Sequence, residues 1–153
     1  MKMSPDTGFA AHASRRARLA GQLGNAVAIV PTAPERIRNR DAHYPYRYDS
    51  YFYYLTGFRE PEAVLVLAGG ERPQSILFCR EKNAEREIWD GFRFGPAAAR
   101  EAFGFDAAYC IDELDVRMPD LLADRSAVQV HLGADAAWDA RVLGWINVVR
   151  SRA

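Results

Sequence analysis

Short, mainly apolar runs alternate along this chain with segments whose apolar residues recur every three or four positions. The run at 26–30 is uninterrupted and β-branched, which fits a strand covered on both faces of a sheet. Further strands are predicted at residues 63–68, 75–79, 107–111 and 127–132. Helical spacing marks residues 4–23, 95–104, 112–123 and 135–149. This alternation predicts the α/β class.

One connection sets the direction of two strands. Gly69-Gly70 and Arg72-Pro73 form a turn between the second and third runs, which predicts an antiparallel hairpin. Helices separate the later runs, and the hairpin makes the expected sheet mixed in direction. We therefore expect a single three-layer domain with a mixed central β-sheet of about five to six strands flanked by helices.

The last helix has a clear predicted start and a clear apolar face. Asp135 is placed to cap it. Its larger apolar residues follow one another at intervals of four, three and four, which puts them on one side; they are Trp138, Val142, Trp145 and Val149.

Two segments fit neither pattern. Residues 35–46 are polar and predict an exposed loop, and the aromatic residues at 51–54 match neither period, although we favour a short helix over 48–55. Residues 80–95 are charged and Gly-flanked around Trp89, and we expect a loop there. An indole buries on the order of 150–250 Å² when packed. Trp89 therefore either folds back onto its own sheet or reaches a neighbouring subunit or ligand site.

Six of the seven tyrosines lie between Asp41 and Ala63. Rings with polar tips suit a surface that is partly buried yet still forms hydrogen bonds. Two interpretations remain open for this segment: it anchors a loop on the domain's own core, or it contacts another molecule. The arginines at 36–47 are by themselves typical of a solvated loop.

Composition narrows the functional classes. The chain has 153 residues, with 20 basic and 20 acidic side chains, so charge gives no case for nucleic acid or an anionic membrane as main partner. No apolar run approaches the roughly 20 residues of a membrane span, and the first residues do not form a secretory signal. Cys79 and Cys110 are expected to be free thiols in a reducing cytoplasm, with a disulfide as the less favoured alternative.

Motifs for chemistry are missing from the sequence. His12, His43 and His131 have no ligand at zinc spacing, and there is no nucleophile elbow, dinucleotide fingerprint or phosphate loop. We therefore predict no catalytic residue and no metal ligand in this chain.

Four motifs make the chain recognisable: Asp41-x-x-Tyr-Pro-Tyr-Arg47, Ser50-x-Phe-x-Tyr-Leu-Thr-Gly-Phe58, Glu60-Pro-Glu-Ala-Val-Leu-Val-Leu67 and Glu87-Ile-Trp-x-Gly91. Together they resemble the N-terminal domain of bacterial aminopeptidase P, in the Xaa-Pro aminopeptidase family. The resemblance covers most of the chain.

The resemblance implies a creatinase-like domain over residues 1–153, with a C-terminal pita-bread catalytic domain absent from this chain. In the family, that second domain holds two Mn²⁺ ions and removes an N-terminal residue that precedes proline. The implied role here is a cytoplasmic accessory and oligomerisation domain, not catalytic alone. The implied partners are the catalytic domain of the same polypeptide, further copies in a homo-oligomer, and a proline-containing peptide.

The resemblance also carries two residues to the entrance of the active site, across a subunit contact. Trp89 would form an apolar wall, and Asp41, beside Arg47, would hold a polar partner or the cationic amino end of a peptide. The competing hypothesis is a stand-alone creatinase-like module that binds another protein without peptidase activity. An independent enzyme with an unrecognised site is disfavoured by the missing catalytic constellation.

Overall fold

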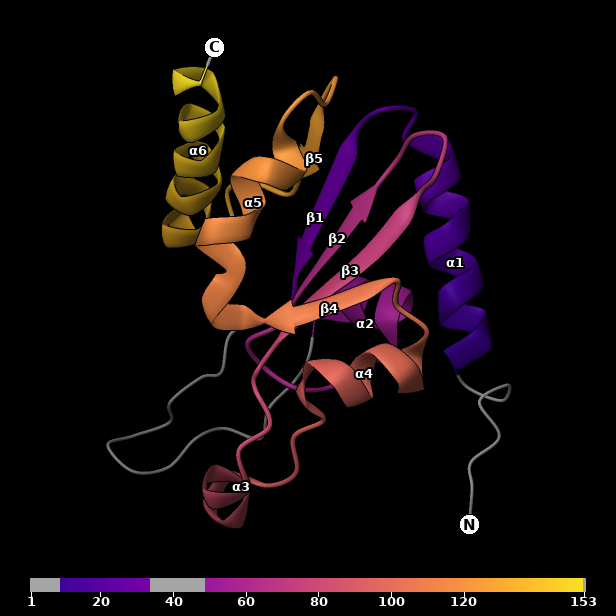
Figure 1. The fold of residues 1–153 in the computed structure, drawn as a ribbon, viewed down its shortest axis with the longest axis vertical. Coiled ribbons are helices and arrows are strands. Elements are labelled where there is room, and N and C mark those ends of the chain that lie inside the picture. The colour runs from indigo at the N-terminus through magenta and orange to yellow at the C-terminus, as the bar shows by residue number, and fades with distance from the viewer. Residues whose placement is uncertain (1–8, 34–48, 153) are drawn as a thin grey trace.

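The computed structural model describes residues 9–33 and 49–152 (Figure 1). The helices are α1 (Phe9–Gln22), α2 (Ser50–Thr56), α3 (Ala84–Asp90), α4 (Gly95–Phe103), a 3₁₀ turn η1 (Ile111–Glu113), α5 (Leu114–Leu122) and α6 (Ala136–Ser151). The strands are β1 (Val27–Pro31), β2 (Val64–Ala68), β3 (Gln74–Cys79), β4 (Ala107–Cys110) and β5 (Val128–Val130). No helix in these ranges is long and apolar enough to cross a membrane.

The five described strands form one sheet in the order β4-β3-β2-β1-β5. Strand β2 lies at the centre and pairs antiparallel with both β1 and β3. The two outer strands run parallel to their neighbours, β4 to β3 and β5 to β1. The predicted hairpin and the mixed sheet of an α/β domain are confirmed.

Helices cover both faces of the sheet (Figure 1). Leu65 and Leu67 of β2 face the core beneath α1, α2 and α4, which we call the first core. Val64 and Val66 face the second core, beneath α5 and α6. This alternation follows from the period of two along a strand, and it explains why β2 reads as an unbroken apolar run. The three layers are those expected from the sequence.

Local signals placed several elements correctly. Asp135 caps α6, where its carboxylate accepts hydrogen bonds from the backbone N–H groups of Ala137 and Trp138. The helix predicted over 48–55 is α2, and Asp49 caps it by accepting from the N–H of Phe52 at 2.8 Å. Residues 4–8 of the first predicted helix and the predicted loop at 35–46 lie outside the described residues.

Arg16 is a charged residue inside the first core. It is 2% exposed, and its Nη1 and Nη2 donate to the carbonyl oxygens of Leu55 at 2.9 Å and Phe103 at 2.6 Å. Burial lowers the pKa of its guanidinium to about 10, while the charge of Asp106 opposes this shift. Arg16 thus connects α1 to the ends of α2 and α4.

Candidate functional site

The segment that carries Trp89 is a short helix and not the loop that the sequence predicted. Asn83 caps α3 by accepting a hydrogen bond from the N–H of Arg86 at 3.1 Å, and the N–H of Gly91 donates to the carbonyl of Glu87 at 3.1 Å. The signal was present, since Asn is a favoured N-cap and Ala-Glu-Arg-Glu are good helix formers. The sequence nevertheless suggested a loop, because Gly91 and the many charged residues are also typical of loops.

The helix stands away from the sheet and from the other helices, in the connection between β3 and α4 (Figure 1). We call residues 82–93 the α3 tip. Three of its side chains are strongly exposed: Ile88 at 78%, Trp89 at 85% and Phe92 at 63%. The interpretation in which Trp89 folds back onto its own sheet is therefore wrong. The tip presents apolar surface that the described part of the domain does not cover.

A network of charges braces the α3 tip from within. Lys82 Nζ lies 2.6 Å from Glu87 Oε1 and donates to the carbonyl of Arg93 at 2.7 Å. Glu87 Oε1 also accepts a hydrogen bond from the backbone N–H of Arg93 at 2.9 Å. The hydrogen bond from Arg93 and the ammonium of Lys82 hold the pKa of Glu87 below its usual value. This brace joins the start and the end of the tip.

The ends of the tip also approach one another through backbone. Gly95 has φ +75°, and a Cβ built there would lie 2.8 Å from Cβ of Lys82. Glycine is needed on both counts. Lys82 Nζ further lies 4.1 Å from the ring centroid of Phe92, so one lysine contacts both the charged brace and the exposed aromatic surface.

Glu60 fixes the base of the tip to the body of the domain. Its Oε1 accepts a hydrogen bond from the Arg80 guanidinium at 3.2 Å, and its Oε2 accepts from the backbone N–H of Phe94 at 2.8 Å. The ring of Phe94 packs against Phe58 and Phe103 in the first core. The second and third sequence motifs are therefore in physical contact with the segment that contains the fourth.

The base of the tip contains two buried donors without an acceptor. The Nε atoms of Arg80 and Arg93 are buried and have no hydrogen-bond partner among the described residues. A buried unpaired donor costs free energy.

The described part of the tyrosine-rich segment, α2, has features of both interpretations. In α2, Phe52 and Leu55 are buried in the first core, whereas Tyr51 and Tyr54 face outward. The helix therefore anchors itself on the domain and also displays two rings on the surface. Asp41 and Arg47, the other two predicted site residues, lie outside the described residues, so only Trp89 of the three is placed.

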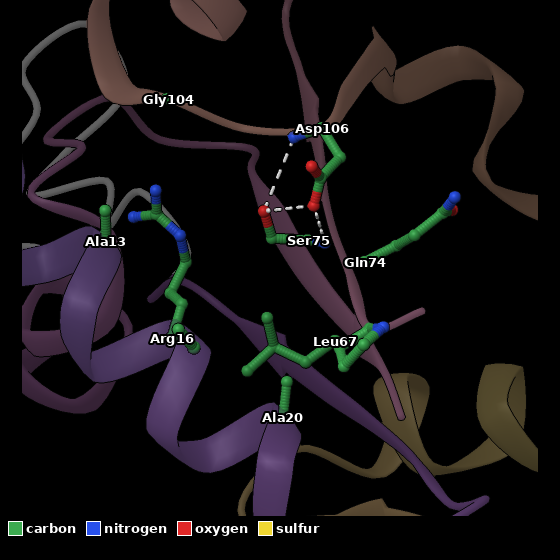
Figure 2. Close-up of a pocket in the computed structure, with 10 residues that line it drawn as sticks. Ala13, Arg16, Ala20, Leu67, Gln74, Ser75, Gly104 and Asp106 are labelled. Carbon is green, nitrogen blue, oxygen red and sulfur yellow. Dashed lines mark hydrogen bonds between the residues drawn. The ribbon is translucent and has the colours of Figure 1, made fainter. Parts of the chain in front are cut away.

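The described residues contain no group of three or more His, Cys, Asp or Glu side chains that would hold a metal ion. A hollow of about 340 Å³ lies between α1 and β3 and is lined by Arg16, Ser75 and Asp106 (Figure 2). Asp106 Oδ2 accepts from both the N–H and the hydroxyl of Ser75, at 2.7 and 3.2 Å. Since Arg16 is likewise bound to backbone carbonyls, the polar groups of this hollow already serve the fold.

The fold and the site together define a class: a three-layer α/β domain with a mixed sheet, without a recognisable catalytic centre in its described part, that projects a braced apolar tip. The profile of the aminopeptidase P N-terminal domain matches residues 12–131. The chain therefore belongs to the aminopeptidase P N-terminal domain family.

Individual relatives agree with this assignment. The chain is 42% identical over 139 residues to the Xaa-Pro aminopeptidase of Escherichia coli K12, which covers 89% of this chain and 32% of that protein. Human Xaa-Pro aminopeptidase 3 is 34% identical over 114 residues, covering 71% of this chain and 22% of that protein. The solved structure of Pseudomonas aeruginosa aminopeptidase PepP superposes with a TM-score of 0.90 at 44% identity. That superposition covers 97% of this chain and 34% of the other, so the chain spans about a third of the length of these bacterial relatives.

Proposed function

We propose that the chain is the N-terminal accessory and oligomerisation domain of a manganese-dependent Xaa-Pro aminopeptidase. The parent enzyme removes an N-terminal residue that precedes proline, and this domain shapes the entrance to its active site without catalysing the reaction alone. Family membership and the relatives named Xaa-Pro aminopeptidase support the class of enzyme. Two free thiols in the chain agree with a cytoplasmic enzyme.

The observation that carries the proposal is the exposure of Trp89 on a braced support. An indole that remains 85% exposed offers a large apolar surface to a partner. Tryptophan is also enriched among the residues that dominate binding energies at interfaces. Because Lys82, Glu87 and Arg93 already hold the tip in shape, little conformational entropy is lost when a partner covers the ring.

The partner in this proposal is the catalytic domain of the same or an adjacent subunit, which corresponds to the part of the relatives that the chain does not span. Trp89 would form an apolar wall beside the bound proline-containing peptide. Asp41 and Arg47 would provide charged groups at the same entrance.

The metal ions of the proposed enzyme belong to the catalytic domain. The described residues do not fit a manganese site, since no group of three or more suitable side chains is present among them. In two-metal hydrolases the ions activate the attacking water. This domain would contribute shape and binding only.

The test is a substitution in the enzyme expressed from the native reading frame. We expect Trp89→Ala to lower kcat/KM on peptides longer than the dipeptide by about tenfold, as loss of one interface aromatic does, with manganese content unchanged. Leu143→Ala is the matched control, since Leu143 is exposed on α6, far from α3 in the fold (Figure 1). Equal kinetics for Trp89→Ala and the wild type would contradict the proposed role of Trp89.

Two further measurements separate the competing functions. The isolated chain with Mn²⁺ and an Xaa-Pro peptide is expected to show no turnover, and clear turnover would overturn the accessory role. A native reading frame that stops at Ala153 would instead favour the stand-alone creatinase-like binding module. In that case Trp89→Ala is expected to abolish binding of a protein partner.

A further inference from the structure

The two cysteines of the chain lie opposite one another in the sheet. Strand β3 ends at Cys79, strand β4 ends at Cys110, and the parallel register pairs these two residues. Neighbouring strands are about 4.8 Å apart, which falls within the separation of about 4.4–6.8 Å between the Cα atoms of disulfide-linked residues. Both cysteines are free thiols in this structure.

The two thiols also point to the same face of the sheet. Cys79 belongs to the first core, and Ala108 of β4 packs against that core, whereas Phe78 and Tyr109 face the other core. Because side chains alternate along a strand, Cys110 lies on the same side as Ala108 and Cys79.

We propose that Cys79 and Cys110 form a redox modification site, a dithiol that a low-molecular-weight disulfide such as glutathione disulfide converts into an intrachain disulfide. This inference is independent of the proposed function. Both residues are the last of their strands. In a reducing compartment the pair remains as two thiols.

The order of the reaction follows from exposure. Cys110 is half-buried and can meet the oxidant, whereas Cys79 is fully buried. Burial raises the pKa of the Cys79 thiol to about 12, with a further contribution from Glu60. Cys79 is therefore a poor first nucleophile, because the thiolate is the attacking species.

The exchange is balanced in two steps. The Cys110 thiolate attacks one sulfur of glutathione disulfide, forms a mixed disulfide and releases one glutathione thiolate. The Cys79 sulfur then attacks the Cys110 sulfur, the bond between Cys110 and glutathione breaks, and the departing glutathione thiolate takes the Cys79 proton. Two cysteine thiols are oxidised, and one glutathione disulfide is reduced to two glutathione molecules.

The disulfide would act at the base of the α3 tip. Cys79 directly precedes Arg80, which binds Glu60. A covalent bond between β3 and the edge strand β4 would fix the point at which the chain leaves the sheet towards α3. Oxidation is thus expected to stiffen the support of Trp89 as well as to raise the stability of the domain.

The test is to equilibrate the chain with glutathione buffers of increasing oxidised fraction, block free thiols with N-ethylmaleimide and measure the mass. We expect a loss of about 2 Da with no glutathione retained, a peptide pair linking Cys79 to Cys110, and a melting temperature that rises by several degrees. In Cys79→Ala we expect a stable glutathione adduct on Cys110. In Cys110→Ala we expect Cys79 to stay reduced while the chain is folded.

Three outcomes would overturn the proposal. They are two reduced thiols at every ratio, a stable glutathione adduct on Cys110 in the unsubstituted chain, and a disulfide that links two chains. The measurement on the unsubstituted chain decides alone if either variant fails to fold.

Discussion

The carboxylate of Glu60 accepts a hydrogen bond from the backbone N–H of Phe94 at 2.8 Å, across 34 positions of sequence. The same carboxylate binds Arg80 at 3.2 Å, and both side chains of this ion pair are 11% exposed. One residue thus holds the entry and the exit of the excursion that carries Trp89. The position of the α3 tip depends on this carboxylate and on the contacts among Lys82, Glu87 and Arg93.

We expect Glu60→Gln to destabilise the domain by about 1.5–3 kcal/mol, since it weakens a buried charge-assisted hydrogen bond and leaves Arg80 without its counter-ion. Urea unfolding measures this change. Asp120→Asn is the control, because its ion pair with Arg152 at 2.9 Å is exposed and should contribute less than about 1 kcal/mol. Similar losses of stability for the two variants would show that the contacts of Glu60 contribute no more than an exposed ion pair.

The brace of the α3 tip should depend on pH through Glu87. Folding depresses the pKa of Glu87, so its stabilising contribution is present above the ordinary glutamate value of about 4.3 and is lost as pH falls through the lowered value. The backbone amide of Arg93, which donates to Glu87, reports this step. Its NMR shift should titrate with a midpoint below 4.3. A midpoint at the ordinary value would contradict the brace.

Arg16 and Arg18 lie on the same helix and should respond differently to the same substitution. Arg16→Lys is expected to cost about 2–4 kcal/mol, because a single ammonium cannot reach both carbonyls that the buried guanidinium binds. Arg18 is exposed, and Arg18→Lys should change stability by less than about 0.5 kcal/mol. Chemical denaturation of both variants checks this, and a tolerated Arg16→Lys would remove Arg16 as the tie between α1, α2 and α4.

Two glycine-to-alanine substitutions should change the stability of the domain in opposite directions. Gly57 ends α2 with φ +71°, and an added Cβ would lie 2.8 Å from the ring of His12, so Gly57→Ala should cost about 1–3 kcal/mol. Gly144 lies within α6 and an added Cβ meets nothing within 4 Å. Gly144→Ala should therefore stabilise the domain by about 0.5–1 kcal/mol. The melting temperatures of the two variants test this prediction. A change in the same direction for both variants would contradict it.

Much of the fold was predictable because its signals are local. The hairpin of β2 and β3 follows from one turn, and the start of α6 follows from the capping chemistry of Asp135. Arg16 of the first helix is a different case, since the structure places it in the core. The sequence did not reveal that Arg16 remains charged there, because its acceptors are carbonyls 39 and 87 positions away.

The candidate site was less accessible to sequence reasoning. Trp89 stood out in the sequence as an indole among charged residues and glycines. The contacts that support it, between Lys82 and Glu87 and between Glu60 and Phe94, are not indicated by any helical or strand periodicity. The order of the strands was equally hidden. Strand β5 pairs with β1, with Val128 opposite Val27 about a hundred positions earlier, and no local motif indicates this pairing.

The close approach of Gly95 to Lys82 has a consequence for how this domain can vary. The chain leaves and rejoins the body of the domain at nearly the same place. We therefore expect that the length and composition of the α3 tip can change while the sheet register and both cores stay the same. Transplanting residues 83–93 between members of the family, with Lys82 and Phe94 kept, is therefore a practical way to alter what the tip contacts while the rest of the domain stays the same.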